Sequence, residues 1–203
     1  MVFEGIDGSG KTTVSRFIYN RLRKVCSVKL TSEPYDRTIL ATAEACERKF
    51  ADAPVSAIDC SALLFTHDRA VHTLNIRRWL TQGMTVLCDR YFMSTIAYQG
   101  AQYRLKDVDR SSWLRAINRP FMDAPDMLIY MDSDTSVAIS RIRSRGAHSP
   151  LFENEQLLRE TAASYRREYR AYRGAKLSIN ANGRASEVCE EVLYAIKSAM
   201  ELS

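Results

Sequence analysis

Short apolar runs alternate along this chain with stretches that have helical spacing. Four runs are apolar, β-prone and flanked by polar or turn residues: residues 25–31, 84–88, 127–131 and 176–179. Such runs are typical of strands buried on both faces of a parallel sheet. Residues 1–3 fit the end of a further strand.

Helical spacing appears between these runs. Two stretches repeat apolar residues on one helical face, Val14, Phe17, Ile18 and Leu22 in the first and Val188, Val192, Ile196 and Met200 in the second. Residues 56–81 contain no proline or glycine and predict a long helix. The alternation predicts an α/β fold with a doubly wound parallel sheet. Ligands bind at the carboxyl ends of such strands, so we expect chemistry just after residues 31, 88, 131 and 179.

Length and composition narrow the class of protein. The chain has 203 residues, of which 46% are hydrophobic and 26% charged. This predicts one domain over residues 1–203, with no apolar run near the ~20 residues of a membrane span and no secretory signal. Five scattered cysteines without a C-x-x-C pair are typical of reduced cytosolic thiols. The net charge of +5 fits either a solvated basic surface or a polyanionic partner.

A phosphate-binding loop lies almost at the start of the chain. Residues 5–12 read GIDGSGKT and match G-x-x-x-x-G-K-[ST]. In this motif backbone N–H groups surround phosphates, the lysine reaches the β/γ-phosphates and the hydroxyl binds magnesium. The motif predicts that ATP is bound by Gly5, Gly8, Ser9, Gly10, Lys11, Thr12 and Thr13. ATPases, GTPases, helicases and small kinases share the loop, but the guanine-reading N-K-x-D of small GTPases is missing from the sequence.

A second candidate pocket follows residue 88. Asp89 falls where a second magnesium-associated carboxylate is expected, opposite Thr12. Arg90 follows it, and a guanidinium suits a phosphoryl group because it donates two hydrogen bonds at once. From this dipeptide alone, a surface ion pair fits equally well.

Three segments in order resemble the thymidylate kinase family, whose members phosphorylate dTMP with ATP. They are EGIDGSGKTT at 4–13, LLFTHDR at 63–69 and DRYFMSTIAYQG at 89–100. The resemblance runs from residue 3 to about residue 181. It implies a three-layer P-loop nucleoside-monophosphate-kinase fold with a short lid. It also implies a magnesium-dependent homodimer in the cytoplasm.

The resemblance also implies roles on the acceptor side. Phe65 matches the residue that stacks on thymine, although helical spacing alone favours a core position. Arg69, four residues on, matches a contact to the thymine carbonyl side and the phosphate region. Arg90 matches the arginine that grips the dTMP phosphate, and Tyr98 matches the tyrosine that crowds the sugar 2′ position. Asp7 matches the contact to the 3′-hydroxyl and supports the catalytic geometry.

The other acceptor-side matches are less complete. They are Glu33, Pro34, Ser94, Thr95 and Gln99. The family often has arginine just before the Glu-Pro pair, where this chain has Ser32. Arg37 is the candidate substitute, with a spacing one residue longer.

Phosphoryl transfer needs positive charge on the transferred group more than it needs a base. Family members with glycine at the position of Gly8 use lid arginines for this purpose. We therefore expect a basic lid at about residues 141–152, with Arg145 and then Arg141 as catalytic arginines. A solvated basic face is the alternative. Ala181 matches an adenine-lining position, although Asn180 replaces the aspartate of the family pattern.

These observations predict an ATP- and Mg²⁺-dependent dTMP kinase without a nucleic-acid or membrane partner. One alternative is a deoxynucleoside kinase or another nucleoside-monophosphate kinase. A second, from another class, is a nucleic-acid-stimulated P-loop ATPase, suggested by the positive charge.

Overall fold

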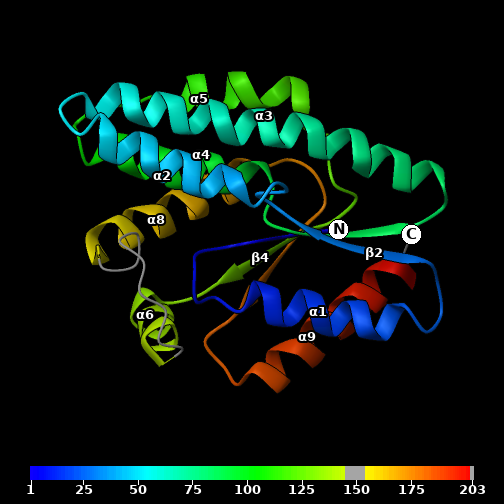
Figure 1. Ribbon diagram of the computed structural model, residues 1–203. Helices are drawn as coiled ribbons and strands as arrows, with labels where there is room; N and C mark the ends of the chain where they lie inside the picture. Colours follow the sequence, from blue (N-terminus) through cyan, green and yellow to red (C-terminus); the bar gives the residue numbers. More distant parts are fainter. Residues whose placement is uncertain (145–153, 202–203) are drawn as a thin grey trace.

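A parallel sheet forms the centre of the molecule. The computed structural model describes residues 1–144 and 154–201. Within them, five parallel strands pair in the order β2-β3-β1-β4-β5 (Figure 1). The strands are β1 (Val2–Glu4), β2 (Val28–Ser32), β3 (Thr85–Asp89), β4 (Leu128–Asp132) and β5 (Lys176–Asn180). The predicted parallel sheet is confirmed.

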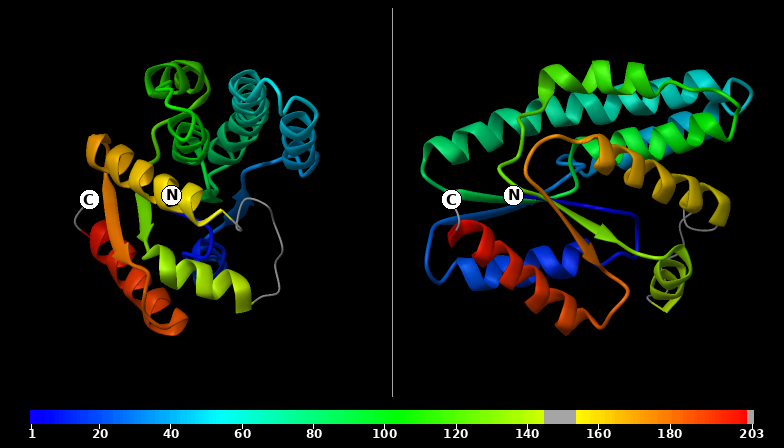
Figure 2. Two further views of the ribbon diagram at one scale, coloured as in Figure 1. Left: turned by 90° about the vertical axis from the view of Figure 1, so that its left-hand side faces the viewer. Right: turned by 180° about the vertical axis from the view of Figure 1, so that it is seen from behind.

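Helices cover both faces of this sheet (Figure 2). One face carries α1 (Lys11–Leu22) and α9 (Ala185–Glu201). The other carries α3 (Pro54–Thr81), α4 (Phe92–Arg104) and α8 (Glu155–Ala171), with α2 (Thr38–Lys49), α5 (Ser111–Asn118) and the 3-10 helix η1 (Arg119–Phe121) packed outside them. α6 (Thr135–Ser144) packs against α8. The predicted three-layer fold is therefore confirmed.

Side-chain alternation along the strands divides the core in two, because successive residues of a strand face opposite sides. Phe3, Leu87, Ile129, Met131 and Ile179 are buried against α1 and α9. Val2, Cys88, Leu128 and Tyr130 are buried against α3, α4 and α8. Both faces are covered, which explains why the strands are continuous apolar runs in the sequence.

The predicted long helix is α3, which begins two residues earlier than residue 56. Pro54 lies in its first turn, where a missing N–H costs no hydrogen bond. Gly83, with φ +74°, follows just beyond its end. Proline and glycine thus mark the two ends of the helix at the positions that each tolerates best.

The phosphate-binding loop connects β1 to α1 and needs its glycines. Gly5, Gly8 and Gly10 all have positive φ, at 146°, 78° and 91°. A Cβ at Gly5 would lie 2.7 Å from the Met131 carbonyl oxygen, and one at Gly8 would lie 2.4 Å from the Ala138 carbonyl oxygen. The backbones of β4 and α6 therefore pack directly on the loop, and this placement of α6 leaves no room for an arginine at position 8.

We expect Gly8→Ala to destabilise the protein more than Gly83→Ala. Both residues have positive φ, but a Cβ added at Gly83 would meet no atom within 4 Å. Gly83→Ala should cost about 1–2 kcal/mol from backbone strain alone. Gly8→Ala should cost about 1–3 kcal/mol more, because Ala138 must also move. Chemical denaturation of both variants checks this, and equal losses would contradict the packing argument.

Candidate active site

Two cavities open where the strands end. The larger, of about 470 Å³, is lined by Asp7, Glu33, Pro34, Leu40, Ala43, Glu44, Glu47, Phe65, Asp68, Arg69, Arg90, Ser94, Thr95, Tyr98, Gln99 and Gln102. The smaller, of about 350 Å³, is lined by Thr12, Ser15, Arg16, Leu30, Thr31, Ser32, Glu33, Asp89 and Arg90. Glu33 and Arg90 line both. Arg90 therefore lies between the larger cavity and the smaller one, which Thr12 of the phosphate-binding loop also lines.

Asp7, Arg90 and Tyr98 form a compact polar cluster at this junction. The Arg90 guanidinium forms an ion pair with Asp7 and lies 5.2 Å from the centre of the Tyr98 ring. The Tyr98 hydroxyl donates to Asp7 Oδ2 at 2.7 Å and accepts from the Asp7 N–H at 3.0 Å. Arg90 itself has φ +71°, so the chain turns sharply between β3 and α4.

The charges in this cluster determine its protonation. Burial acts to raise the pKa of Asp7, but Arg90, Lys11 and the Tyr98 hydrogen bond together hold that pKa below its ordinary value. Burial, together with the Asp7 carboxylate, raises the pKa of Tyr98. The cluster therefore holds an anionic Asp7 beside a tyrosine hydroxyl that keeps its proton.

Arg69 is held by several partners in the wall of the larger cavity. Its side chain is 2% exposed. Nε and Nη2 donate to Glu33 Oε2 at 3.0 and 2.5 Å, and Nη2 also donates to Thr95 Oγ1 at 3.0 Å. Nη1 donates to Asn118 Oδ1. The predicted shared face of Phe65 and Arg69 is confirmed, because both line this cavity.

The loop lysine lies in a buried position. Lys11 Nζ donates to the Ile6 carbonyl at 2.7 Å and to Ser9 Oγ at 3.4 Å. Burial, with the nearby Arg90 charge, lowers its pKa to about 8. α1 begins directly after Gly10, which supplies no side-chain cap. The first-turn N–H groups of α1 are therefore available to an anion.

Comparison with known proteins decides the family. The sequence model of the family described as thymidylate kinase matches residues 3–192. The chain belongs to the thymidylate kinase family. A probable thymidylate kinase of Thermoplasma acidophilum is 35% identical over 170 residues, which cover 82% of this chain and 81% of the relative. Another, of Methanococcoides burtonii, is 30% identical over 208 residues, with coverages of 99% and 97%. A third, of Pyrococcus abyssi, is 31% identical, with coverages of 97% and 95%.

This result confirms the resemblance drawn from the three segments, and with it a nucleoside-monophosphate kinase acting on dTMP. Thymidylate kinases use ATP and generally need a divalent metal. The sequence predicts Thr12 and Asp89 as metal-binding residues, and Thr12 Oγ1 donates to Asp89 Oδ2 at 2.5 Å. Asp89 Oδ1 is buried without a hydrogen-bond partner among the described residues.

These oxygens fit a hard divalent cation. Mg²⁺ takes oxygen ligands, usually one or two from the protein, and the rest from phosphates and water. No cluster of three or more His, Cys, Asp or Glu side chains placed to hold a metal occurs in residues 1–144 and 154–201.

Arg141, predicted as a catalytic lid arginine, contacts backbone carbonyl groups in the structure. Its guanidinium donates to the carbonyl oxygens of Ala181 and Gly183, each at 2.7 Å, and to that of Asn182 at 3.2 Å. It also reaches the Gly8 carbonyl at 3.5 Å. It thus joins α6 to the loop after β5 and to the phosphate-binding loop. Arg145 and residues 146–152 of the predicted lid lie outside the described residues.

Two further predicted residues differ in their relation to the cavities. Arg37 is exposed at the start of α2 and is not among the residues that line either cavity. Glu33 lines both cavities, but its carboxylate is occupied by Arg69 and by His72. Glu33 thus lies in the wall of the cavity where the sequence predicts dTMP, with its carboxylate bonded to other side chains.

Sequence reasoning missed several residues that support the site. Glu4 is fully buried, and burial raises its pKa. It accepts hydrogen bonds from the N–H groups of Tyr91 and Met93 and from the hydroxyls of Ser94 and Tyr165. Asn118 and His72 were also missed, and no local spacing singles them out. Arg166 on α8 bonds to Asp132 at the end of β4.

We expect ATP binding to weaken as pH rises above about 8. Lys11 has its pKa lowered to about 8, and bound phosphates favour its charged form, so binding above this pH requires proton uptake. The apparent Kd should then rise by up to about tenfold per pH unit. Lys11→Arg should give a flat profile, because arginine stays protonated. Calorimetric titration between about pH 7 and 9.5 checks this, and a constant wild-type Kd would contradict it.

Proposed function

We propose that this protein transfers the γ-phosphoryl group of ATP to the phosphate of dTMP, giving dTDP and ADP, through the site described above. The observation that carries the residue assignments is the position of Arg90, which lines both cavities beside a complete phosphate-binding loop. The donor is held by the loop amides and by Lys11. Thr12 and Asp89 hold Mg²⁺, which neutralises charge on the phosphates when bound.

The larger cavity is proposed to take dTMP. Phe65 stacks on the base, Thr95 and Gln99 face its edge, and Arg69 contacts its carbonyl side. Tyr98 lies against the sugar and leaves no room for a 2′-hydroxyl. Pro34 and Ser94 complete the lining.

Charge and position provide the catalysis. Arg90 grips the acceptor phosphate with its planar fork. Asp7, anionic beside Arg90, accepts from the 3′-hydroxyl and orients the sugar. No strong general base is needed, because the acceptor phosphate is already anionic. The arrangement acts by holding the two phosphates in line and excluding water.

On the donor side, Arg141 has a positioning role. Its four carbonyl contacts hold residues 181–183 against Gly8, and Ala181 lines the adenine pocket. Arg145 remains the proposed arginine for the transferred phosphoryl group. The whole chain is proposed to act as one kinase domain.

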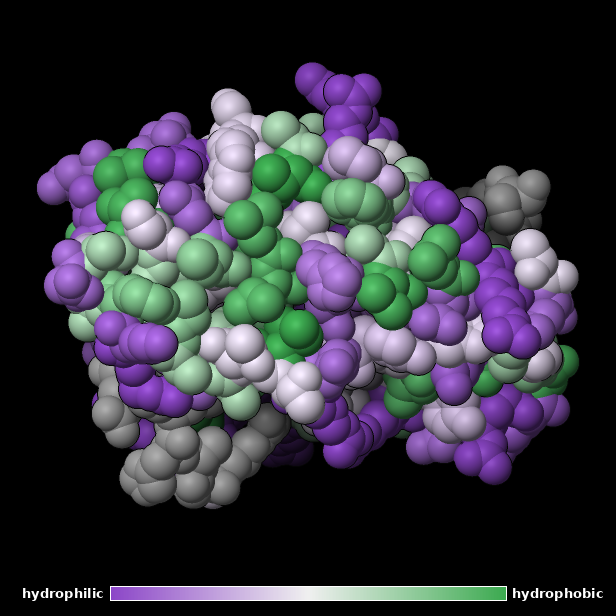
Figure 3. Space-filling view, turned by 45° about the horizontal axis from the view of Figure 1, so that its top comes forward, coloured by the Kyte–Doolittle hydropathy of each residue, from purple (hydrophilic) through white to green (hydrophobic). Residues whose placement is uncertain are grey.

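The protein is further proposed to be a homodimer that uses an exposed face of α3. Leu63, Val71 and Leu74 are 50%, 43% and 64% exposed, and their spacing places them on one side of the helix. Figure 3 shows hydrophobic residues gathered on the face of the molecule that is turned forward. Exposed apolar groups of this kind are typical of an interface.

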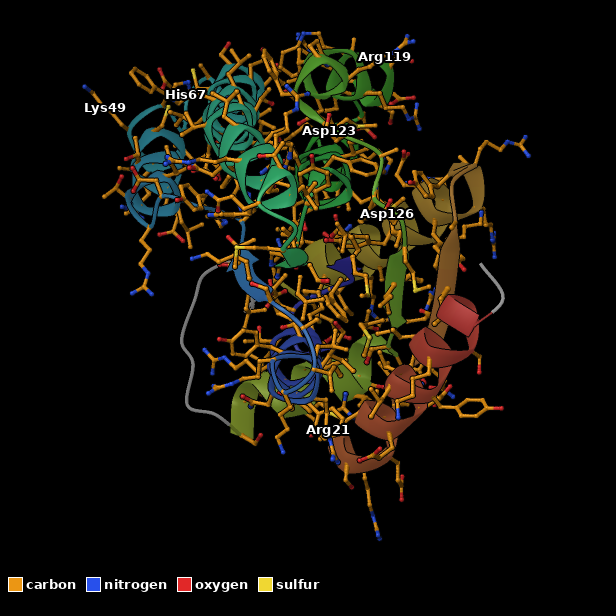
Figure 4. The ribbon with its side chains drawn as sticks, turned by 90° about the vertical axis from the view of Figure 1, so that its right-hand side faces the viewer. Arg21, Lys49, His67, Arg119, Asp123 and Asp126 are labelled. Carbon is orange, nitrogen blue, oxygen red and sulfur yellow. The ribbon has the colours of Figure 1, made fainter. Side chains whose placement is uncertain are left out.

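We also propose a cytoplasmic enzyme without a nucleic-acid partner. No helix in the described ranges is both long and apolar enough to cross a bilayer. Figure 4 shows Arg21, Lys49 and Arg119 pointing outward from three separate places, on α1, α2 and η1. These three residues lie apart, so they do not form together the single patch or stripe that is typical of a nucleic-acid-binding surface.

ADP release with a panel of acceptors tests the reaction. We expect dTMP to be the fastest acceptor, ahead of dUMP, dCMP and AMP, because Phe65, Thr95 and Gln99, the proposed contacts to the base, line the larger cavity. Preference for another nucleotide or for a nucleoside by about tenfold would contradict the assignment. ATP turnover that rises with added DNA and ignores dTMP would favour the P-loop ATPase alternative.

Kinetics of an Arg141 variant distinguish a positioning role from a role on the transferred phosphoryl group. If it positions the donor loop, Arg141→Ala should raise the KM for ATP by about three- to tenfold and leave the KM for dTMP unchanged. Arg143→Ala, exposed on the same helix, is the matched control. A loss of kcat by about a hundredfold at constant KM would instead place Arg141 on the transferred phosphoryl group.

A further inference from the structure

A buried chain of polar side chains runs behind both cavities. Thr31 lines the smaller cavity, and its hydroxyl lies 2.8 Å from His72 Nε2. His72 Nδ1 lies 3.1 Å from Glu33 Oε1, and the other oxygen of Glu33 accepts from Arg69. Arg69 lines the larger cavity. The chain thus extends from the wall of one cavity to the wall of the other.

His72 is the central member of this chain and has no contact with either cavity. Its side chain is 0% exposed, and it is not among the residues lining the two cavities. The Glu33 carboxylate accepts from Arg69 through its other oxygen, and a carboxylate can only accept hydrogen bonds. His72 Nδ1 therefore carries the proton in its hydrogen bond to Glu33. In the neutral ring Nε2 accepts from the Thr31 hydroxyl. The ring therefore has a defined tautomer and orientation.

Packing holds the ring in this orientation. The Tyr35 ring stacks on His72 with centroids 4.6 Å apart and an angle of 13° between the planes. The backbone N–H groups of Tyr35 and Asp36 donate to Asp68 at 2.6 and 2.8 Å. Asp68, Arg69 and His72 all belong to α3, so one helix holds the segment after β2 by three side chains.

We propose that His72 is a positioning residue for dTMP binding, which holds the Glu33 carboxylate so that Arg69 faces the base. This inference rests on the proposed role of Arg69. Arg69 donates to Glu33 through both Nε and Nη2, and its other acceptors are Thr95, Asn118 and the Tyr91 carbonyl. Glu33 is the charged member of this set, so its position helps to set the plane of the guanidinium. Without the His72 donor, one oxygen of a buried carboxylate loses its partner, and the Arg69–Glu33 pair must rearrange to satisfy it.

Two isosteric variants separate the contacts of His72. Asparagine places its amide near the position of Nδ1, and glutamine places its amide near the position of Nε2. We expect His72→Asn to keep the donor to Glu33 and to keep the KM for dTMP near the wild-type value. His72→Gln and His72→Ala should each raise it by about tenfold, with the KM for ATP unchanged.

A double-mutant cycle with Arg69 tests the route of the effect. If His72 acts through Arg69, His72→Ala should add nothing to the KM for dTMP in an Arg69→Ala background. Additive effects, or equal increases in both KM values, would overturn the inference, because a general structural role predicts them. Thermal unfolding of each variant shows whether it is folded. If His72→Ala does not fold, the comparison of His72→Asn with His72→Gln tests the inference in its place.

The single variants distinguish failure of this inference from failure of the proposed function. A raised KM for dTMP in Arg69→Ala together with a wild-type KM in His72→Ala and His72→Gln would overturn the inference alone. A wild-type KM in Arg69→Ala would remove both the proposed role of Arg69 and the inference that rests on it.

Discussion

The buried carboxylate of Glu4 holds the two halves of the site together. It lies at the end of β1, directly before the phosphate-binding loop, and accepts four hydrogen bonds from α4 and α8. Burying such a group is costly unless its hydrogen-bonding capacity is met, and here both oxygens have partners. Because Tyr91 and Met93 donate through their backbones, the start of α4 is held against β1.

The position of Arg90 follows from this constraint. Arg90 lies between β3, which pairs with β1, and the residues that bond to Glu4. The chain can make this short turn only with a positive φ at Arg90, an uncommon conformation for a residue other than glycine. The turn directs the guanidinium toward Asp7 and Tyr98. A strained backbone conformation of this kind persists where surrounding contacts hold it in place, as the hydrogen bonds to Glu4 do here.

Charged side chains in and beside the site have partners within the protein. Asp7 with Arg90, Glu33 with Arg69, and Arg141 with backbone carbonyls are all paired in the structure. Phosphoryl transfer depends on charge that is already oriented when the phosphates align. Pairing also lowers the cost of burying each ion, since an isolated buried charge would be strongly destabilising.

Local patterns in the sequence predicted the elements that carry their own signals. The apolar runs marked β2 to β5, and each strand extends to the polar residue after its run, as Asp89 and Asn180 show. α1 and α9 were predicted from spacing, and α3 was predicted from a long stretch without proline or glycine. α4 was not predicted, because it is buried on much of its surface and lacks a clear polar face.

The sequence alone determined the phosphate-binding loop, the parallel sheet and the family. Each of these depends on residues close together in the chain, where glycine positions and residue spacing act directly on the backbone. Only the tertiary structure decided that Arg141 bonds to carbonyl oxygens after β5 and that Glu33 bonds to Arg69 and His72. It also decided that Glu4 accepts a hydrogen bond from the Tyr165 hydroxyl. These contacts join residues 36 to 161 positions apart. Their partners are selected by how layers pack on the sheet, and a side chain's neighbours across layers leave no periodic trace in the sequence.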